Sequence, residues 1–225
     1  MKNFVFDIYG TLVDIKTDEQ SSRFKRRFSA YFNKHNKNGV DFFAEYFSRC
    51  AQKDNGGDSE LDLFAVFKEI CGESEATEIA QKFRSLSRSR LKVYRGIKKL
   101  LKTLKGGGAK LYILSNAQTC FTLPELEKLK LMKYFDGVEI SSEFGKKKPS
   151  KEFFEHVVNK YSLEKSETVY IGNDFVCDIL GAKSAGLKAV YISSNLSPET
   201  DELAKISEVA DFVTDKVSEL KNYLI

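Results

Sequence analysis

Short apolar runs, separated by amphipathic segments, constrain the fold of this chain more than any other feature of its sequence. Most of the runs are apolar nearly throughout, as strands buried on both faces of a parallel sheet are. Between them, the apolar side chains of residues 97–104 and 150–161 recur at helical spacing. This alternation predicts an α/β fold built on a doubly wound parallel sheet with right-handed crossovers. The predicted strands are Asn3–Ile8, Lys110–Ser115, Gly137–Ser141, Thr168–Gly172, Ala189–Ser193 and, more weakly, Asp211–Thr214.

Residues 15–90 lack a convincing strand run and carry aromatic side chains at helical spacing instead. A length of 225 residues is compatible with one large domain or with a core and a smaller insert. The aromatic stripes predict an inserted helical bundle with an aromatic core. The insert begins just after the first strand and returns to the sheet near Val93. It can therefore lie over the C-terminal end of that strand, where open α/β sheets bind ligands.

The composition removes several classes of active site. The chain has only two histidines, His35 and His156, and four cysteines without a CxxC pair. A His/Cys zinc site, a disulfide framework and a Ser-His-Asp triad are therefore poor interpretations. Any catalysis is expected to rest on carboxylates, lysines and hydroxyl groups.

Charge and hydropathy indicate a cytoplasmic protein that binds neither nucleic acid nor a membrane. The formal net charge of +4 is too small, unless clustered, to indicate a nucleic-acid partner. The N-terminal residues lack a secretory hydrophobic region, and no stretch approaches the roughly 18 apolar residues of a membrane span. The cysteines are then expected to be reduced. The sequence makes no prediction of oligomeric state.

Two predicted strands end in polar side chains of the kinds that catalytic and anion-binding sites use. Asp7 ends an apolar run and is followed by a turn at Gly10. An isolated charge at the end of a buried strand is costly unless a metal, a cation or a reaction uses it. Ser115 and Asn116 follow a second apolar run, and their side chains can donate hydrogen bonds to an anion.

Two later segments complete this set. Lys148 is the last of three consecutive lysines and precedes Pro149, which opens a predicted helix. Asp174 and Asp178 follow the strand that ends at Gly172 and are spaced four residues apart. Oxygen-only ligands of this kind suit Mg²⁺.

These four segments, in this order on parallel strands, resemble the haloacid dehalogenase (HAD) superfamily of hydrolases. The similarity rests on the Asp-x-x-Gly-Thr-Leu motif from Asp7, the Ser-Asn pair at 115–116, the Lys-Pro pair at 148–149 and the region 172–178. It implies a Rossmann-like core formed by residues 1–14 and 91–225. It also implies a mobile helical cap at residues 15–90.

The resemblance further implies roles for individual residues. Asp7 would be the nucleophile that forms an aspartyl intermediate, and Thr11 would orient it. Gly10, Ser115 and Asn116 would bind the transferring group. Lys148 would neutralise charge on Asp7 and on the substrate.

In the phosphoryl-transferring members, Mg²⁺ is held by the nucleophile, a backbone carbonyl and an acidic residue of the last motif. Here these are Asp7, the carbonyl of Tyr9 and a residue of the 173–178 segment. The metal would relieve the repulsion between Asp7 and a phosphate group.

The chain departs from the family pattern at two positions. Tyr9 stands where family phosphatases usually carry a second Asp, the general acid and base, whose loss typically costs about 10²–10⁴ in rate. Asn173 stands where an Asp commonly follows the glycine. Counted back from Asp178, the longer family spacing makes Asn173 the first metal ligand, and the shorter spacing makes it Asp174. The pair Asp174 and Asp178 is preferred because it retains the charge that Mg²⁺ requires.

The leading functional prediction is a Mg²⁺-dependent phosphatase that acts on a small, anionic, phosphorylated metabolite. Tyr9 supports a first alternative, a metal-independent hydrolase similar to the 2-haloacid dehalogenases, which also have Tyr there. The absence of Trp and of a matching cap helix counts against that alternative. A second alternative is a catalytically weak HAD-fold binding protein. The basic run Arg23–Arg27 is interpreted as the solvated face of a cap helix, or as a recognition site for an anionic substrate.

Overall fold

The predicted apolar runs form the central sheet of the computed structural model, which describes residues 2–36 and 39–225. All neighbouring strands of this sheet are parallel, and β1 lies at its centre between β4 and β6. The chain builds one half of the sheet, returns, and builds the other half, so the strand order reverses beside β1. From one edge of the sheet to the other, the strands are β5 (Gly137–Ile140), β4 (Lys110–Ser115), β1 (Asn3–Phe6), β6 (Thr168–Gly172), β7 (Lys188–Ile192) and β8 (Phe212–Thr214).

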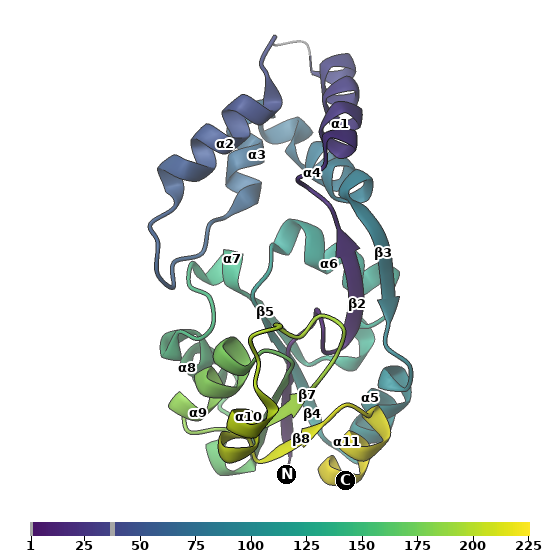
Figure 1. Ribbon diagram of the computed structural model, residues 1–225, viewed down its shortest axis with the longest axis vertical. Helices are drawn as coiled ribbons and strands as arrows, with labels where there is room; N and C mark the ends of the chain where they lie inside the picture. Colours follow the sequence, from purple (N-terminus) through teal and green to yellow (C-terminus); the bar gives the residue numbers. More distant parts are fainter. Residues whose placement is uncertain (1, 37–38) are drawn as a thin grey trace.

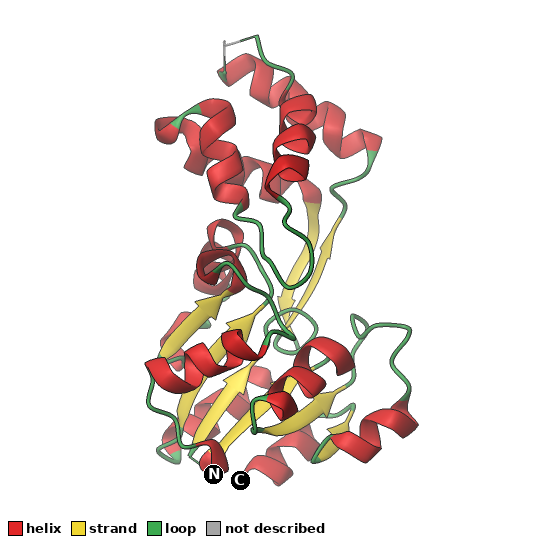
Figure 2. Cartoon of the chain, turned by 90° about the vertical axis from the view of Figure 1, so that its left-hand side faces the viewer, coloured by secondary structure: helices red, strands yellow, loops and turns green. Residues whose placement is uncertain are grey.

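Helices cover both faces of the sheet, as the alternating pattern predicts (Figures 1 and 2). Phe4 and Phe6 of β1 pack on one face with α5, α6 and α11, whereas Val5 points to the other face and packs with α8, α9 and α10. This three-layer arrangement confirms the doubly wound α/β prediction. The core helices are α5 (Ile97–Gly106), α6 (Thr119–Lys128), α7 (Ser141–Phe144), α8 (Lys151–Lys160), α9 (Gly181–Ser184), α10 (Leu203–Val209) and α11 (Val217–Leu224).

Four further helices lie above the C-terminal edge of the sheet and form what we call the helical unit (Figure 1). They are α1 (Ser22–His35), α2 (Phe42–Lys53), α3 (Leu63–Cys71) and α4 (Glu73–Ser87). Their apolar core is built largely from phenylalanine rings, with Phe28 and Phe83 at ring-centroid distances of 4.6 to 5.9 Å from several neighbours. From outside the helical unit, Phe121 and Cys120 of α6 also pack into this cluster. The aromatic stripes of the sequence therefore form a packed interior.

The expectation that residues 15–90 contain no strand is wrong. β2 (Val13–Thr17) and β3 (Arg88–Val93) pair as an antiparallel ribbon that connects the sheet to the helical unit. Most of this ribbon is exposed or only partly buried, and β3 reads Arg-Ser-Arg-Leu-Lys-Val. A ribbon with so few buried apolar side chains lacks the hydrophobic signal by which strands are found in a sequence.

None of the helices in the described ranges has the length and apolar character that crossing a membrane requires. The four cysteines are free and partly buried.

The stability of the helical unit should depend on its aromatic core. Phe28 is fully buried, so Phe28→Ala should lower the free energy of unfolding by about 3–5 kcal/mol through lost burial and a cavity. Phe47, on α2, is 44% exposed, and Phe47→Ala should cost about 1 kcal/mol or less. Chemical denaturation of both variants measures the difference, and an equal loss in the two would contradict this description of the core.

Candidate active site

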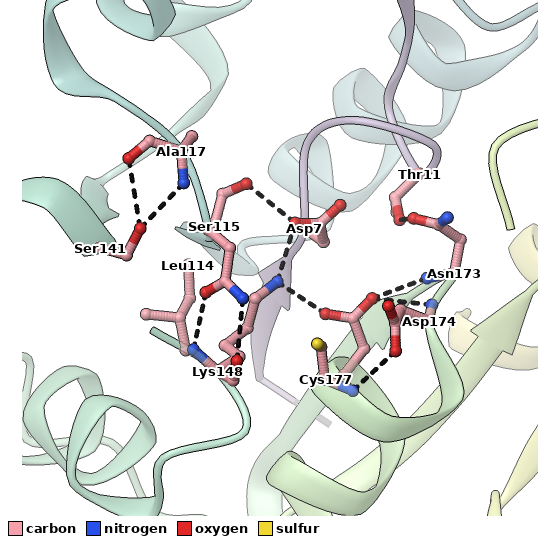
Figure 3. A network of polar contacts seen from close by, with 12 residues as sticks. Asp7, Thr11, Leu114, Ser115, Ala117, Ser141, Lys148, Asn173, Asp174 and Cys177 are labelled. Atoms are coloured by element: carbon pink, nitrogen blue, oxygen red, sulfur yellow. Dashed lines mark hydrogen bonds and ion pairs between the residues drawn. The ribbon is translucent and has the colours of Figure 1, made fainter. Parts of the chain in front are cut away.

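Asp7 and Ser115 meet at the C-terminal edge of the sheet because their strands are neighbours. Asp7 follows β1 directly, and Ser115 is the last residue of β4. The hydroxyl group of Ser115 donates a hydrogen bond of 2.9 Å to Oδ1 of Asp7 (Figure 3). Asp7 is only 7% exposed. The structure thus brings together two residues that lie 108 positions apart in the sequence.

Lys148 supplies the positive charge that this buried carboxylate requires. Its ammonium group donates to Oδ1 of Asp7 at 2.8 Å and to Oδ1 of Asp178 at 2.6 Å. Burial raises the pKa of Asp7, and the charge of Lys148 opposes that rise. Burial would lower the pKa of Lys148, but the charges of Asp178 and Asp7 raise it above its usual value. Lys148 therefore remains a cation between two carboxylates.

The two oxygens of the Asp7 carboxylate have different surroundings. Among the described residues, no hydrogen bond ends on Oδ2 of Asp7, whereas Oδ1 accepts from both Ser115 and Lys148. Every fully buried side-chain oxygen or nitrogen in the described part of the chain has a hydrogen-bond partner. Oδ2 of Asp7 is therefore reached by solvent, and its lone pairs are available to a ligand or an electrophile.

Asn116, predicted from the sequence to bind an anion, has its side chain hydrogen-bonded to the backbone of Lys148. Its amide group donates to the carbonyl of Lys148 at 2.9 Å and accepts from the Lys148 backbone N–H at 2.7 Å. This reciprocal pair clamps the backbone of Lys148 to the end of β4. Asn116 thereby fixes the loop from which the ammonium group reaches Asp7.

Asp178 accepts a hydrogen bond at each of its lone pairs. Oδ1 accepts from Lys148 and from Tyr170, and Oδ2 accepts from the backbone N–H groups of Asn173 and Asp174 at 2.9 and 3.0 Å. A carboxylate offers about four acceptor positions. Asp178 is thus an organising group, buried to 1% exposure, for the turn that follows β6.

Asn173 and Asp174 point in different directions from this turn. The side chain of Asn173 accepts a hydrogen bond of 3.0 Å from the hydroxyl of Thr11 and lies against Gly10. A Cβ atom on Gly10, whose φ is +96°, would come within 2.3 Å of that amide, so this close approach requires glycine. Asp174 instead caps the helical turn of residues 175–180 by accepting from the N–H of Cys177 at 2.7 Å.

Tyr9 directs its hydroxyl group to Glu125 of α6. The phenol donates a short hydrogen bond to Oε2 of Glu125 and lies 3.2 Å from the hydroxyl of Thr122. Glu125 also pairs with Arg84 and Arg88 at 2.7 and 2.5 Å. Burial, followed by the charge of Glu125, raises the pKa of the Tyr9 phenol, which therefore stays protonated. The side chain that stands in place of the usual second Asp thus links the loop after β1, through Glu125 and Arg84, to the helical unit.

Sequence reasoning missed Glu125 and Arg84. One signal was available: Glu125 lies one turn from Phe121 on the face of residues 119–128 that also carries Leu126, so a carboxylate falls on the buried face of a helix. Its partners, which lie 41 and 37 residues away in the sequence, become visible only in the folded chain.

The loop between α2 and α3 reaches down to the core beside the Lys148 segment (Figure 1). Its backbone pairs with that segment, because Glu60 N–H donates to the Gly145 carbonyl at 3.0 Å and Lys147 N–H donates to the Asp58 carbonyl at 2.8 Å. The Glu60 carboxylate also accepts from Ser141 at 2.6 Å. The helical unit therefore contacts the core on two sides, at this loop and at Glu125.

The basic run Arg23–Arg27 does not join the Asp7 cluster. Arg23 and Arg27 line a surface pocket of about 310 Å³ with Ser87 and Arg88, and none of the residues placed around Asp7 above lines it. This position favours the solvated-face interpretation of α1.

Residues 1–186 match a known family, described as haloacid dehalogenase-like hydrolases. The chain belongs to the haloacid dehalogenase-like hydrolases. The family prediction made from the four motifs is therefore confirmed. A HAD phosphatase structure from Thermococcus onnurineus shares the fold, with a TM-score of 0.66 and 23% identity over 100% of this chain and 98% of that one.

Curated relatives of this HAD-like chain are named as phosphatases. A glyceraldehyde 3-phosphate phosphatase of Methanothermobacter thermautotrophicus is 32% identical over 121 residues, and the alignment spans about half of each chain, 54% of both. A ribulose-1,5-bisphosphate 5-phosphatase of Halopiger xanaduensis is 26% identical over 96% of both chains.

The charged cluster around Glu125 should be a major source of stability. Glu125→Gln would leave Arg84 and Arg88, whose side chains are only 12% and 14% exposed, without their buried counter-ion. Removing one partner of a buried ion pair typically costs about 3–5 kcal/mol, and we expect a loss of that size in the free energy of unfolding. Glu127 is exposed on the same helix, so Glu127→Gln is the matched control and should change stability by less than about 0.5 kcal/mol. Equal stability of the two variants would show that the cluster contributes nothing.

Proposed function

We propose that this protein is a Mg²⁺-dependent phosphatase that hydrolyses small phosphorylated metabolites through an aspartyl intermediate at Asp7. The observation that carries the proposal is the difference between the two oxygens of the Asp7 carboxylate. Oδ1 is held by Lys148 and Ser115, and Oδ2 is free of hydrogen bonds among the described residues. The phosphatase names of the two relatives described above support the same reaction class.

The chain's own residues account for the first chemical step. Oδ2 of Asp7 would attack the phosphorus atom, forming a P–O bond to the carboxylate as the bond to the leaving oxygen breaks. Lys148, fixed at 2.8 Å from Oδ1, would offset the negative charge that accumulates where two anions approach each other. Water would then cleave the aspartyl phosphate, releasing inorganic phosphate and restoring Asp7. The leaving oxygen takes up one proton.

The oxygen atoms around Asp7 fit the ligand set of Mg²⁺. Besides Oδ2 of Asp7, the backbone carbonyl of Tyr9 accepts no hydrogen bond within the described ranges. No group of three or more His, Cys, Asp or Glu side chains in those ranges could hold a metal by itself. Mg²⁺ usually takes one or two carboxylates and fills its other positions with water and substrate phosphate. We propose Asp7, the Tyr9 carbonyl, and an oxygen of Asn173 or Asp174 as its ligands.

Bound there, the metal would supply positive charge to the phosphate oxygens. Asp178 is proposed as the orienting group of this site, because its lone pairs are occupied by four hydrogen bonds. A related HAD-hydrolase, YfnB of Bacillus subtilis, has been solved bound to magnesium, which supports the choice of metal. It is 20% identical to this chain, with a TM-score of 0.59.

We further propose that residues 15–90 act as the cap of this active site. The helical unit lies above the edge of the sheet that carries Asp7 (Figure 2). Its loop between α2 and α3 is hydrogen-bonded beside Lys148, through Asp58 and Glu60. We propose that residues of that loop contact a substrate bound at Asp7.

Tyr9 favours a second candidate, a metal-independent dehalogenase. Halide leaves without a proton, so a reaction of that kind does not need the general acid that Tyr9 replaces. The hydrogen bond from Tyr9 to Glu125 is compatible with this reaction, since it directs the phenol to α6. Halide release from 2-chloropropionate in the presence of EDTA, without phosphatase activity, would establish this candidate in place of the first.

The Asp7→Asn variant tests the nucleophile. Phosphate release from a panel of small phosphate monoesters should require added Mg²⁺ and should fall by at least about 10³-fold in this variant, because an amide cannot form the aspartyl intermediate. Colorimetric phosphate measurement follows the reaction, and thermal unfolding checks that the variant is folded. Ligand binding without turnover in both proteins would instead indicate a HAD-fold binding protein.

A further inference from the structure

The ammonium group of Lys148 has three N–H donors, and all three are used. Two reach Asp7 and Asp178, and the third donates to the hydroxyl oxygen of Tyr170 at 2.8 Å. The Lys148 side chain is 2% exposed, so water cannot replace a missing partner freely. The position of this charge is therefore set by three atoms, of which the sequence motifs account for two.

Tyr170 is buried beside Lys148 and has contacts on several sides. It lies on β6 next to β1, is fully buried, and packs edge-on against Phe154 of α8 with ring centroids 5.1 Å apart. Its hydroxyl lies 2.8 Å from Oδ1 of Asp178 and 3.1 Å from the carbonyl of Leu114, the residue before Ser115. The single phenolic proton is donated to Oδ1 of Asp178, the nearer of these two acceptors, and a lone pair stays available to Lys148. A phenyl ring alone would fill the same space without fixing the ammonium group.

The two carboxylates compete for Lys148. The contact to Asp178, at 2.6 Å, is shorter than the contact to Asp7, at 2.8 Å. Without a third acceptor, an ammonium group in a buried site would move toward the closer carboxylate. Tyr170 opposes this movement in two ways, because it accepts one N–H of Lys148 and its hydroxyl lies against the same Asp178 oxygen.

We propose that Tyr170 is a positioning residue of the active site, which holds the ammonium group of Lys148 against Oδ1 of Asp7. It acts through Lys148 and does not contact the substrate. The kinetic evidence for this role rests on the proposed phosphatase function, whereas the contact itself can be tested without turnover.

The matched pair of variants is Tyr170→Phe and Tyr191→Phe. Tyr191 is also a buried tyrosine, lies on the neighbouring strand β7 and donates its hydroxyl hydrogen bond to Asp201 at 3.0 Å. Both variants lose one buried hydroxyl group, but only Tyr170 contacts Lys148. With Mg²⁺ and p-nitrophenyl phosphate or an active metabolite, Tyr170→Phe should lower kcat by about tenfold or more and change KM by less than about threefold. Tyr191→Phe should keep kcat within about twofold of wild type. Equal kcat values in the two variants would overturn the proposal.

A double-mutant cycle with Lys148→Met separates positioning from general structural support. If Tyr170 acts through Lys148, Tyr170→Phe should not lower kcat further in the Lys148→Met protein. A further tenfold loss in that background would contradict the proposal. The same cycle is followed by urea denaturation, where the shift in unfolding midpoint caused by Tyr170→Phe should be smaller without Lys148. Equal midpoint shifts in both backgrounds would show that the contact does not couple the two residues.

The stability cycle also distinguishes failure of the proposed function from failure of this inference. If wild-type protein releases no phosphate from any monoester, the phosphatase proposal fails, and coupling in the urea cycle alone decides whether Tyr170 positions Lys148. If wild-type protein is active, both the kinetic and the stability cycles must show coupling. A Tyr170→Phe protein that does not fold, beside a folded Lys148→Met/Tyr170→Phe protein, supports the coupling. Failure of both to fold, with Tyr191→Phe folded, overturns it in favour of a purely structural role.

Discussion

The neutralisation of buried charge at the centre of the sheet is the constraint on which the rest of this site depends. Asp7, Asp178 and Lys148 are almost fully removed from water, and isolated ions there would be costly. The fold meets this cost by bringing Asp7, after β1, and Asp178, in the turn after β6, to the ammonium group of Lys148 in the loop before α8. Because two carboxylates share that single cation, the site retains negative charge. A cationic ligand beside Asp7 is compatible with this balance.

A second polar cluster joins the two parts of the molecule. The sheet core and the helical unit have largely separate apolar interiors, and Phe121 and Cys120 of α6 pack into the aromatic cluster. Contacts between them include the ion pairs of Glu125 with Arg84 and Arg88. Tyr9, two residues beyond Asp7, donates to the same carboxylate. A chain of hydrogen bonds and ion pairs therefore connects α4 with the loop that follows β1.

Tyr9 departs from the family pattern, and the structure shows which contacts its side chain makes instead. In the sequence it is only the loss of an acid from a phosphatase motif. In the folded chain its phenol is buried, kept protonated by burial and by Glu125, and used to connect α6 with the loop after β1. The reaction proposed here must then obtain the leaving-group proton from a group other than a carboxylate at position 9. The structure likewise shows what the Asn116 side chain does: it exchanges two hydrogen bonds with the backbone of Lys148.

The sequence by itself determined the parallel sheet, the helical insert and the meeting of Asp7 with Ser115, and the family resemblance added Lys148 to this neighbourhood. Apolar runs and helical periodicity are local patterns, and the C-terminal ends of parallel strands must meet at one edge. Only the tertiary structure decided that β2 and β3 form a ribbon, since polar strands carry no such pattern. It also decided that Asn173 faces Gly10 and Thr11, that Asp178 is saturated, and that Tyr170 completes the Lys148 site. Most of these results depend on partners that are distant in the chain, and the saturation of Asp178 depends on the direction of hydrogen bonds from nearby residues as well. Spacing along a sequence encodes neither.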